Sequence, residues 1–108
     1  MNRAQTVLPG LRRYLSPDGS LEPGAPPASR DNALLLRLYR AMVLTRTFDA
    51  KAVNLQRTGR LGTYASSLGQ EAVGVGAAAA MQAEDVLLPS FREHGAQLWR
   101  GVTLTELF

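Results

Sequence analysis

The segment Ser90–Gly95 (SFREHG) has residue types and spacing suited to holding an anion. Ser90 followed three positions later by Glu93 is the pattern of a capping box, which predicts a helix that starts here with Phe91 and Arg92 in its first turn. The unpaired N–H groups and the dipole at a helix N-terminus favour a phosphate, and the guanidinium of Arg92 adds a fork of donors. We therefore expect Phe91 and Arg92 to lie at an anion-binding site.

A short buried strand is predicted directly before this helix. Residues 85–88 are an acid followed by three apolar residues, and Pro89 ends the run because proline cannot extend a β-ladder. Open α/β sheets bind ligands at this kind of strand end, so the placement supports the anion site. The competing interpretation is an ordinary capped helix with Arg92 as a solvated surface charge, and the local pattern alone favours it.

The composition is that of a single soluble globular domain. The 108 residues are 45% hydrophobic and 19% charged. They contain no cysteine, which excludes a disulfide framework and thiolate chemistry. The longest apolar run is far shorter than a membrane span. We accordingly expect a cytoplasmic protein with no membrane partner.

The net charge of +3 comes mainly from eleven arginines against a single lysine. These arginines are scattered along the chain, and the few aromatic residues are not interleaved with them as base stacking would require. The positive charge is therefore compatible with nucleic-acid binding, but no sequence motif supports it. We expect no nucleic-acid partner. Weak, steeply salt-dependent binding is the hypothesis that the charge leaves open.

Residues 1–30 are predicted to form an N-terminal arm. They hold five of the six prolines and few large apolar side chains, and Ser16–Gly19 (SPDG) reads as a turn. Three arginines precede the first acidic residue, as in an organelle transit peptide, but an amphipathic repeat and a serine-rich bias are missing. We favour an arm that lies on another subunit or stays mobile.

A long amphipathic helix is predicted from Asp31, which can cap it, to Gly59, which suits a C-terminal stop. Apolar residues recur on one face at spacings of three, four and seven: Leu34, Leu38, Ala41, Phe48, Ala52 and Leu55. Five more widen this stripe: Leu35, Tyr39, Met42, Val43 and Leu44. The width favours a helix covered on two sides, within a larger protein or by a partner, over a simple core helix.

A loop suited to lining a site and a thin helix follow. Residues 59–67 have no periodicity but combine two glycines, three hydroxyls and a tyrosine. Ser67 and Gln70 make a second capping box, which predicts a helix over 68–83. The stretch Gly74–Ala79 mimics a dinucleotide-binding fingerprint but lies inside this helix and not after a strand, so we interpret it as close packing.

A third capping box, Thr103 with Glu106, predicts a helix close to the end of the sequence. Residue 108 lies within two turns of its start, and so short a helix is not stable alone. The pattern also predicts only one strand, which would have no partner to pair with. These features suggest the front part of a longer protein.

Four blocks in this order resemble one protein family: Arg57–Tyr64 (RTGRLGTY), Leu68–Ala72 (LGQEA), Asp85–Gly95 (DVLLPSFREHG) and Arg100-Gly101. They are similar to the N-terminal part of the α subunit of thiamine-diphosphate-dependent 2-oxo acid dehydrogenases. These enzymes are the decarboxylating first component of the pyruvate and branched-chain 2-oxo acid dehydrogenase complexes. The resemblance covers residues 31–108 and implies an α/β fold class. It corresponds to the N-terminal portion of a thiamine-diphosphate-binding fold, with long helices plus the first parallel strand, mostly helical within this sequence.

The resemblance implies roles for two groups of residues. An aromatic–arginine pair that contacts the diphosphate of the cofactor in the family corresponds to Phe91 and Arg92, although Phe91 lacks the hydroxyl of the tyrosine often found there. The loop before the Gly-Gln-Glu-Ala block faces the 2-oxo acid pocket in the family, which places Thr63, Tyr64 and Ala65 near the substrate. Some pyruvate-specific members have histidine at the position of Ala65.

The remaining equipment of the family lies outside this sequence. The motif that binds Mg²⁺ and the diphosphate comes after residue 108, so no catalytic and no metal-binding residue is assigned here. We interpret His94 as structural, because a lone histidine is more often a satisfied structural group than a proton shuttle. The implied partners are a β subunit in an α2β2 tetramer, which supplies the carboxylate that activates the cofactor, and a lipoyl-bearing acyltransferase core.

The implied function is oxidative decarboxylation of pyruvate with transfer of the acyl group to lipoyl, by a longer subunit with its β partner and not by this segment alone. Branched-chain 2-oxo acids are the alternative substrates. A non-enzymatic helical interaction module built on residues 34–55 is the alternative from another class. That module explains neither the capping boxes nor the Phe91-Arg92 turn.

Overall fold

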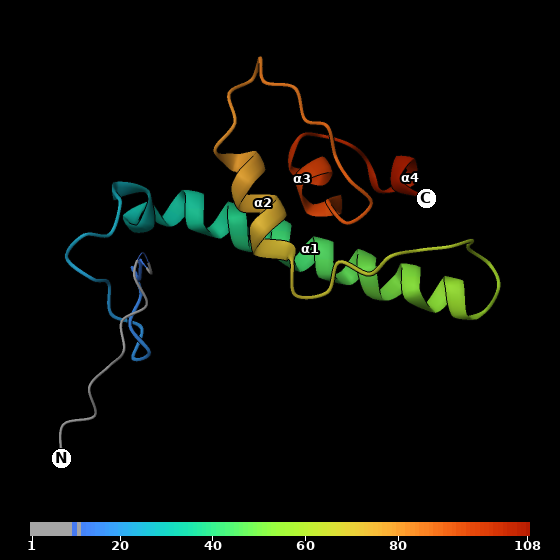
Figure 1. Cartoon of the computed structure of the whole chain (residues 1–108), viewed down its shortest axis with the longest axis horizontal. Helices are drawn as coiled ribbons and strands as arrows, with labels where there is room; N and C mark the ends of the chain where they lie inside the picture. The colour runs from blue at the N-terminus through green and yellow to red at the C-terminus, as the bar shows by residue number, and fades with distance from the viewer. Residues whose placement is uncertain (1–9, 11) are drawn as a thin grey trace.

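The computed structural model describes residue 10 and residues 12–108, and helices dominate it (Figure 1). A short 3-10 helix precedes four α-helices: Pro27–Arg30, then α1 (Asn32–Arg57), α2 (Glu71–Ala79), α3 (His94–Trp99) and α4 (Leu104–Leu107). Of the predicted N-terminal arm, residues 1–9 and 11 lie outside the described residues. The division into residues 1–30 and 31–108 stays a prediction.

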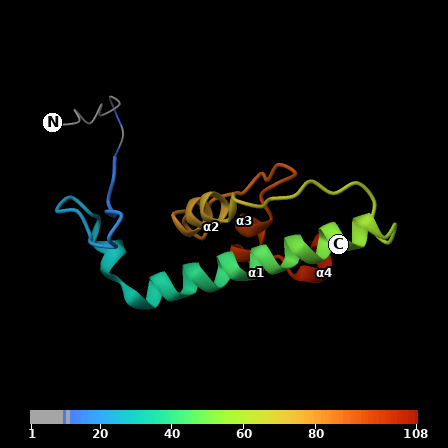
Figure 2. The same cartoon turned by 90° about the horizontal axis from the view of Figure 1, so that it is seen from below.

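Helix α1 is the base on which the other elements lie. Both views show α2 and α3 against the middle of α1, with α4 further along toward its C-terminal half (Figures 1 and 2). The loop 58–70 turns back at the end of α1 and runs beside it to the start of α2 (Figure 2). This reversal places the loop predicted to line a site over the C-terminal half of α1.

The predicted ends of α1 are confirmed. The Asp31 side chain caps the helix by accepting a 3.0 Å hydrogen bond from the backbone N–H of Leu34. At the other end Gly59 adopts a φ of +70°, the left-handed conformation that stops a helix and that glycine takes without strain. The predicted turn Ser16–Gly19 is also present, since the N–H of Gly19 donates to the carbonyl of Ser16 at 2.9 Å.

Small residues let the three central helices approach closely. A Cβ added at Gly74 of α2 would lie 3.3 Å from the backbone nitrogen of Ala96 in α3. A Cβ at Gly95 would lie 3.0 Å from Cγ2 of Val75 and 3.1 Å from Oγ1 of Thr45. The interpretation of the Gly/Ala-rich stretch as close packing is therefore confirmed.

The apolar stripe of α1 is covered on one side only within the described residues. Its buried positions are Thr45, Phe48, Asp49 and Ala52. Four of the five apolar side chains that widen the stripe remain at least 41% exposed: Leu35, Tyr39, Val43 and Leu44. Burial of α1 on its second side stays a prediction about contacts outside this chain.

The predicted strand over 85–88 is wrong for this chain. The described residues contain no strand, only an isolated antiparallel bridge between Leu15 and Leu21. The segment is unpaired, and Val86 and Leu88 are 79% and 87% exposed. A single strand has no neighbour here to accept its ladder hydrogen bonds, so it stays an extended connection between α2 and α3. The described residues thus show a helical arrangement and not the α/β sheet of the expected fold.

Two of the three helix starts predicted from capping boxes also differ from the structure. Helix α2 begins at Glu71 and ends at Ala79, and is shorter than the predicted 68–83, because Ser67 is hydrogen-bonded elsewhere and Gly69 has a φ of +85°. Helix α3 begins at His94, so Phe91 and Arg92 lie in a turn and not in a first helical turn.

The pattern before α3 is only half of a capping box. The Glu93 carboxylate accepts from the N–H of Ser90 at 2.6 Å, but the Ser90 side chain caps nothing in return. The third predicted box is confirmed, because Thr103 and Glu106 make both reciprocal bonds at the start of α4.

Candidate functional site

A buried carboxylate on α1 organises the loop that was predicted to face the substrate. Asp49 is 3% exposed and accepts four hydrogen bonds. Its Oδ1 accepts from the Tyr64 hydroxyl at 2.7 Å and from the backbone N–H and side-chain hydroxyl of Ser67 at 2.7 and 3.3 Å. Its Oδ2 accepts from the Ser66 hydroxyl at 2.7 Å. Every loop contact of this carboxylate is with a neutral donor.

These donors keep Asp49 ionised. Burial alone would raise the pKa of this carboxyl, but the hydrogen bonds from Ser66, Tyr64 and Ser67 outweigh burial and lower the pKa below its usual value of 3.8. Charge-assisted bonds of this kind are stronger than bonds between neutral groups, and they are needed because a buried charge without partners is costly. The site therefore contains a fixed negative charge beneath the loop.

The Tyr64 ring joins the loop to two helices. It lies edge-on to Phe48 of α1, with ring centroids 6.2 Å apart, and stacks on His94 of α3 at 5.3 Å with an interplanar angle of 23°. Phe48 also contacts the rings of His94 at 5.5 Å and Phe108 at 4.7 Å. Burial, followed by the bond to Asp49, raises the pKa of the Tyr64 hydroxyl well above its usual 10.

His94 is half-buried among these aromatic rings, and the structural role expected for it stays a prediction. Burial lowers the pKa of His94, and the nearby charge of Asp49 partly opposes this. Its Nδ1 is buried and has no hydrogen-bond partner. The imidazole is thus held by ring contacts, two residues after Arg92.

The three loop residues assigned to the substrate lie in different environments. Tyr64 and Ala65 are partly buried, whereas Thr63 is exposed. Of the three, only Tyr64 makes a side-chain hydrogen bond, to Asp49. The roles of Thr63, Tyr64 and Ala65 at a substrate pocket stay predictions.

The side chains of Phe91 and Arg92 contact each other. The Arg92 guanidinium carbon lies 5.3 Å from the centroid of the Phe91 ring, a cation–π contact, and Phe91 is 71% exposed. The only ion pair within residues 10 and 12–108 joins Arg46 and Glu71, so Arg92 is not neutralised by a carboxylate in that part of the chain. An exposed arginine without an acidic partner fits an anion such as a diphosphate.

One aromatic contact brings the residues predicted to lie near the substrate close to the Phe91-Arg92 turn. The stacking of Tyr64 on His94 connects the 59–70 loop to the first residue of α3, directly after the Phe91-Arg92 turn. Arg100 closes this part of the fold from the other end of α3, where its guanidinium donates to the carbonyls of Gln82 at 2.8 Å and Ala83 at 3.3 Å. The segment that connects α2 to α3 is therefore held by contacts near both of its ends.

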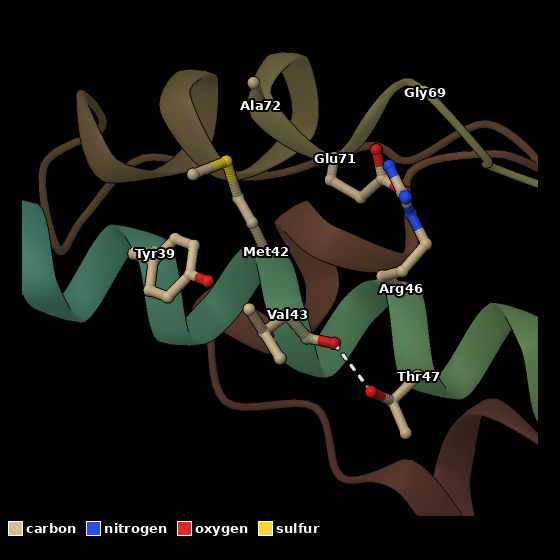
Figure 3. Close-up of a pocket in the computed structure, with 8 residues that line it drawn as sticks. All are labelled: Tyr39, Met42, Val43, Arg46, Thr47, Gly69, Glu71 and Ala72. Carbon is tan, nitrogen blue, oxygen red and sulfur yellow. Dashed lines mark hydrogen bonds and ion pairs between the residues drawn. The ribbon is translucent and has the colours of Figure 1, made fainter.

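A groove lies between α1 and the start of α2. It has a volume of about 490 Å³ and is lined by Tyr39, Met42, Val43, Arg46, Thr47, Gly69, Glu71 and Ala72 (Figure 3). Arg46 and Glu71 extend toward each other across it and form an ion pair, with Glu71 only 7% exposed (Figure 3). The hydrogen bond from Arg46 lowers the pKa of Glu71.

Residues 39–108 match the family described as Dehydrogenase E1 component. The chain belongs to this family. The matched range includes the Asp49 cluster, the 59–70 loop and the Phe91-Arg92 turn.

The relatives of this chain are named as α subunits of two different dehydrogenases. The chain is 38% identical over 94 residues to "2-oxoisovalerate dehydrogenase subunit alpha 1, mitochondrial" of Arabidopsis thaliana, a match covering 87% of this chain and 20% of that protein. It is 46% identical over 74 residues to "Pyruvate dehydrogenase E1 component subunit alpha" of Acholeplasma laidlawii, covering 68% of this chain and 21% of that protein. A Staphylococcus aureus protein with the same name is 42% identical over 74 residues, covering 68% and 20%. No solved structure matches the chain.

The resemblance to α subunits of this family is confirmed. The chain spans about a fifth of the length of the curated relatives that it matches. Because these relatives are named for both pyruvate and 2-oxoisovalerate, the similarity does not distinguish the two substrates.

Sequence reasoning missed the residue that organises the site of this E1 family member. Asp49 lies in the predicted apolar stripe of α1, four positions after Thr45 and three before Ala52, both of which are fully buried. A single acid on a buried helix face requires hydrogen-bond donors, and this signal could have identified Asp49. Glu71 carries the same signal at the start of the Gly/Ala-rich helix.

Two properties of the described residues bear on metal and membrane binding. No group of three or more histidine, cysteine or acidic side chains is placed to hold a metal ion in residues 10 and 12–108. In the same part of the chain, no helix combines the length and apolar character needed to cross a membrane.

Proposed function

We propose that this sequence contributes to the α subunit of a thiamine-diphosphate-dependent 2-oxo acid dehydrogenase, the first component of a multienzyme complex. The reaction is oxidative decarboxylation of a 2-oxo acid, with transfer of the acyl group to lipoyl on an acyltransferase core. The match of residues 39–108 to the E1 family supports this proposal. The named relatives, which are α subunits of pyruvate and 2-oxoisovalerate dehydrogenases, support it further.

The cofactor role rests on the chemistry of the Phe91-Arg92 turn. Arg92 offers a fork of donors with no acidic partner in the described residues, and a planar guanidinium binds a diphosphate through paired hydrogen bonds. Its contact with the Phe91 ring restricts the side chain before any ligand binds. Thiamine diphosphate, when bound, supplies the carbanion chemistry of decarboxylation, while the residues of this chain bind and orient.

The remaining parts of the site are proposed to come from elsewhere. The ligands of Mg²⁺ lie outside this segment, and a β subunit in an α2β2 assembly completes the active site. Thr63, Tyr64 and Ala65 face the 2-oxo acid. Pyruvate is the proposed substrate and branched-chain 2-oxo acids are the alternative. The cytoplasmic location stays a prediction, and the Arabidopsis relative is named as mitochondrial.

Arg92→Ala in the complete α/β enzyme that contains this sequence tests the cofactor role. Loss of a charged hydrogen-bond partner costs roughly 1.5–3 kcal/mol, so thiamine diphosphate should bind about ten- to a hundredfold more weakly. Arg40→Ala is the matched control, because Arg40 is an exposed arginine on α1. Calorimetric titration with thiamine diphosphate measures the change, and equal affinities of both variants and the wild type would refute the assignment. Turnover of pyruvate against 2-oxoisovalerate by the same wild-type enzyme decides the substrate.

A further inference from the structure

We propose that Asp49 is a positioning residue of the 2-oxo acid site: its buried carboxylate holds the segment 63–67 against α1 and so fixes where Thr63, Tyr64 and Ala65 lie. This inference rests on the proposed function, which places that segment beside the substrate. Asp49 belongs to α1, is 3% exposed, and has both oxygens bonded to loop groups, so it acts through the loop and not on the substrate itself.

The loop has few other means of holding its shape. Within residues 62–66, all of them described, no backbone amide donates to a backbone carbonyl and no carbonyl accepts from a backbone amide. The flanking residues are fixed by Leu61, whose amide donates to Leu55 at 3.2 Å, and by Ser67, whose carbonyl accepts from Gln70 at 2.9 Å. Ordering each residue of such a loop costs on the order of 1–2 kcal/mol of backbone entropy. The bonds to Asp49 are the specific interactions that offset this cost.

The direction of the bonds makes the acceptor oxygens of Asp49 important. Four groups from three loop residues donate to one carboxylate: the Tyr64 hydroxyl, the Ser66 hydroxyl, and the amide and hydroxyl of Ser67. The two oxygens of a carboxylate only accept and never donate, so Oδ1 takes two short bonds and the longer 3.3 Å bond from the Ser67 hydroxyl, while Oδ2 takes the bond from Ser66. No apolar residue of similar size could replace it, since four donors would then be buried without a partner or re-exposed together.

Two substitutions of Asp49 separate the loss of its hydrogen-bond acceptors from the loss of its charge. Asp49→Ala removes every acceptor and should release the segment. Asp49→Asn keeps one acceptor oxygen for Tyr64 and Ser67, while the Ser66 hydroxyl can rotate to accept from the new amide group. Asp49→Asn should therefore preserve the loop position. Ser66→Ala removes the donor to Oδ2, together with the acceptor of a 3.2 Å bond from the Leu68 amide, and serves as a milder variant if Asp49→Ala fails to fold.

The first readout is amide hydrogen exchange in the complete α/β enzyme that contains this sequence. The Ser67 amide donates to Asp49, so its exchange should be at least tenfold faster in Asp49→Ala than in the wild type, and close to wild type in Asp49→Asn. Amides in the middle of α1 serve as the internal reference. Asp85→Asn is the matched control, because Asp85 is an exposed acid that accepts a single bond from the Gln82 amide at 2.7 Å. Unchanged protection of Ser67 in both Asp49→Ala and Ser66→Ala would overturn the proposal.

The second readout is steady-state kinetics of the complete α/β enzyme. A misplaced loop should raise KM for the 2-oxo acid by roughly tenfold or more, because small displacements of positioning groups have large effects. The affinity for thiamine diphosphate should stay within about twofold. A purely stabilising role would instead lower the active fraction and leave KM unchanged, and that result would overturn the proposal. A wild-type enzyme inactive on every 2-oxo acid would refute the proposed function, whereas an active wild type with normal KM in Asp49→Ala would refute only the role of Asp49.

Discussion

The hydroxyl of Tyr64 donates to Oδ1 of Asp49 at 2.7 Å, and this bond links a loop without regular structure to the longest helix of the chain. The same tyrosine stacks on His94 at the start of α3, so one side chain joins three parts of the fold. A hydroxyl that donates to a buried anion resists losing its proton. The bond should therefore be visible in how Tyr64 titrates.

Alkaline titration followed by near-ultraviolet absorbance should show that Tyr64 ionises only well above the usual tyrosine pKa of about 10. The chain has three tyrosines, so the difference between the curves of the wild type and Tyr64→Phe isolates this one. Since the folded pKa is raised, Tyr64 contributes stability that is complete below about pH 10 and lost as the pH rises further. Ionisation of Tyr64 near pH 10 with the helical circular dichroism intact would contradict the prediction.

Gly95→Ala should destabilise the fold by about 1–3 kcal/mol, the usual penalty for overpacking. The added Cβ would lie 3.0 Å from Cγ2 of Val75 and 3.1 Å from Oγ1 of Thr45, two of the most deeply buried side chains. Urea unfolding followed by circular dichroism measures the change.

Gly76→Ala is the matched control for this substitution. Gly76 lies inside α2, and a Cβ there meets nothing within 4 Å. Alanine should therefore stabilise the helix by about 0.5–1 kcal/mol. If both alanines shift stability in the same direction, the close contact between α2, α3 and α1 is not what requires glycine at position 95.

The single histidine should titrate below its usual pKa of 6.5, because burial among Phe48 and Tyr64 disfavours the charged imidazolium. A depressed folded pKa means that its contribution to stability is complete above pH 6.5 and is progressively lost as the pH falls below that value. Proton NMR of the one imidazole reports the pKa without ambiguity. His94→Gln should flatten the dependence of unfolding free energy on pH in this range, and an equally steep dependence in the variant would assign it to other groups.

Removing Arg46 should leave the Glu71 carboxylate buried without its partner. The pKa of Glu71, which the hydrogen bond from Arg46 lowers, should then rise. Glu71 contributes stability above its usual pKa of 4.5, and this contribution is lost as the pH falls through the folded pKa. Arg46→Met should therefore lower the melting temperature at neutral pH more than in acid. The double variant Arg46→Met with Glu71→Gln should recover part of the loss, and no recovery would show that the pair is not coupled.

Local patterns were sufficient where a helix end depends on its own neighbours. The Asp31 cap, the stop at Gly59 and the capping box of Thr103 with Glu106 each involve residues within a few positions of one another. Their hydrogen bonds form inside a single turn, so the sequence around them determines the outcome. Membership of the E1 family was likewise readable from four short blocks.

Tertiary structure decided the rest. Ser67 has the spacing of a helix cap, but its amide and hydroxyl bind Asp49, eighteen positions earlier, and the helix starts later. The apolar run before Pro89 has the pattern of a strand, yet it pairs with nothing in the described residues. A hydrogen-bonding side chain or an extended segment binds whichever partner the fold brings within reach, and that partner lies far away in sequence. Asp49 is buried rather than exposed for the same reason: the loop returns along α1 and covers it.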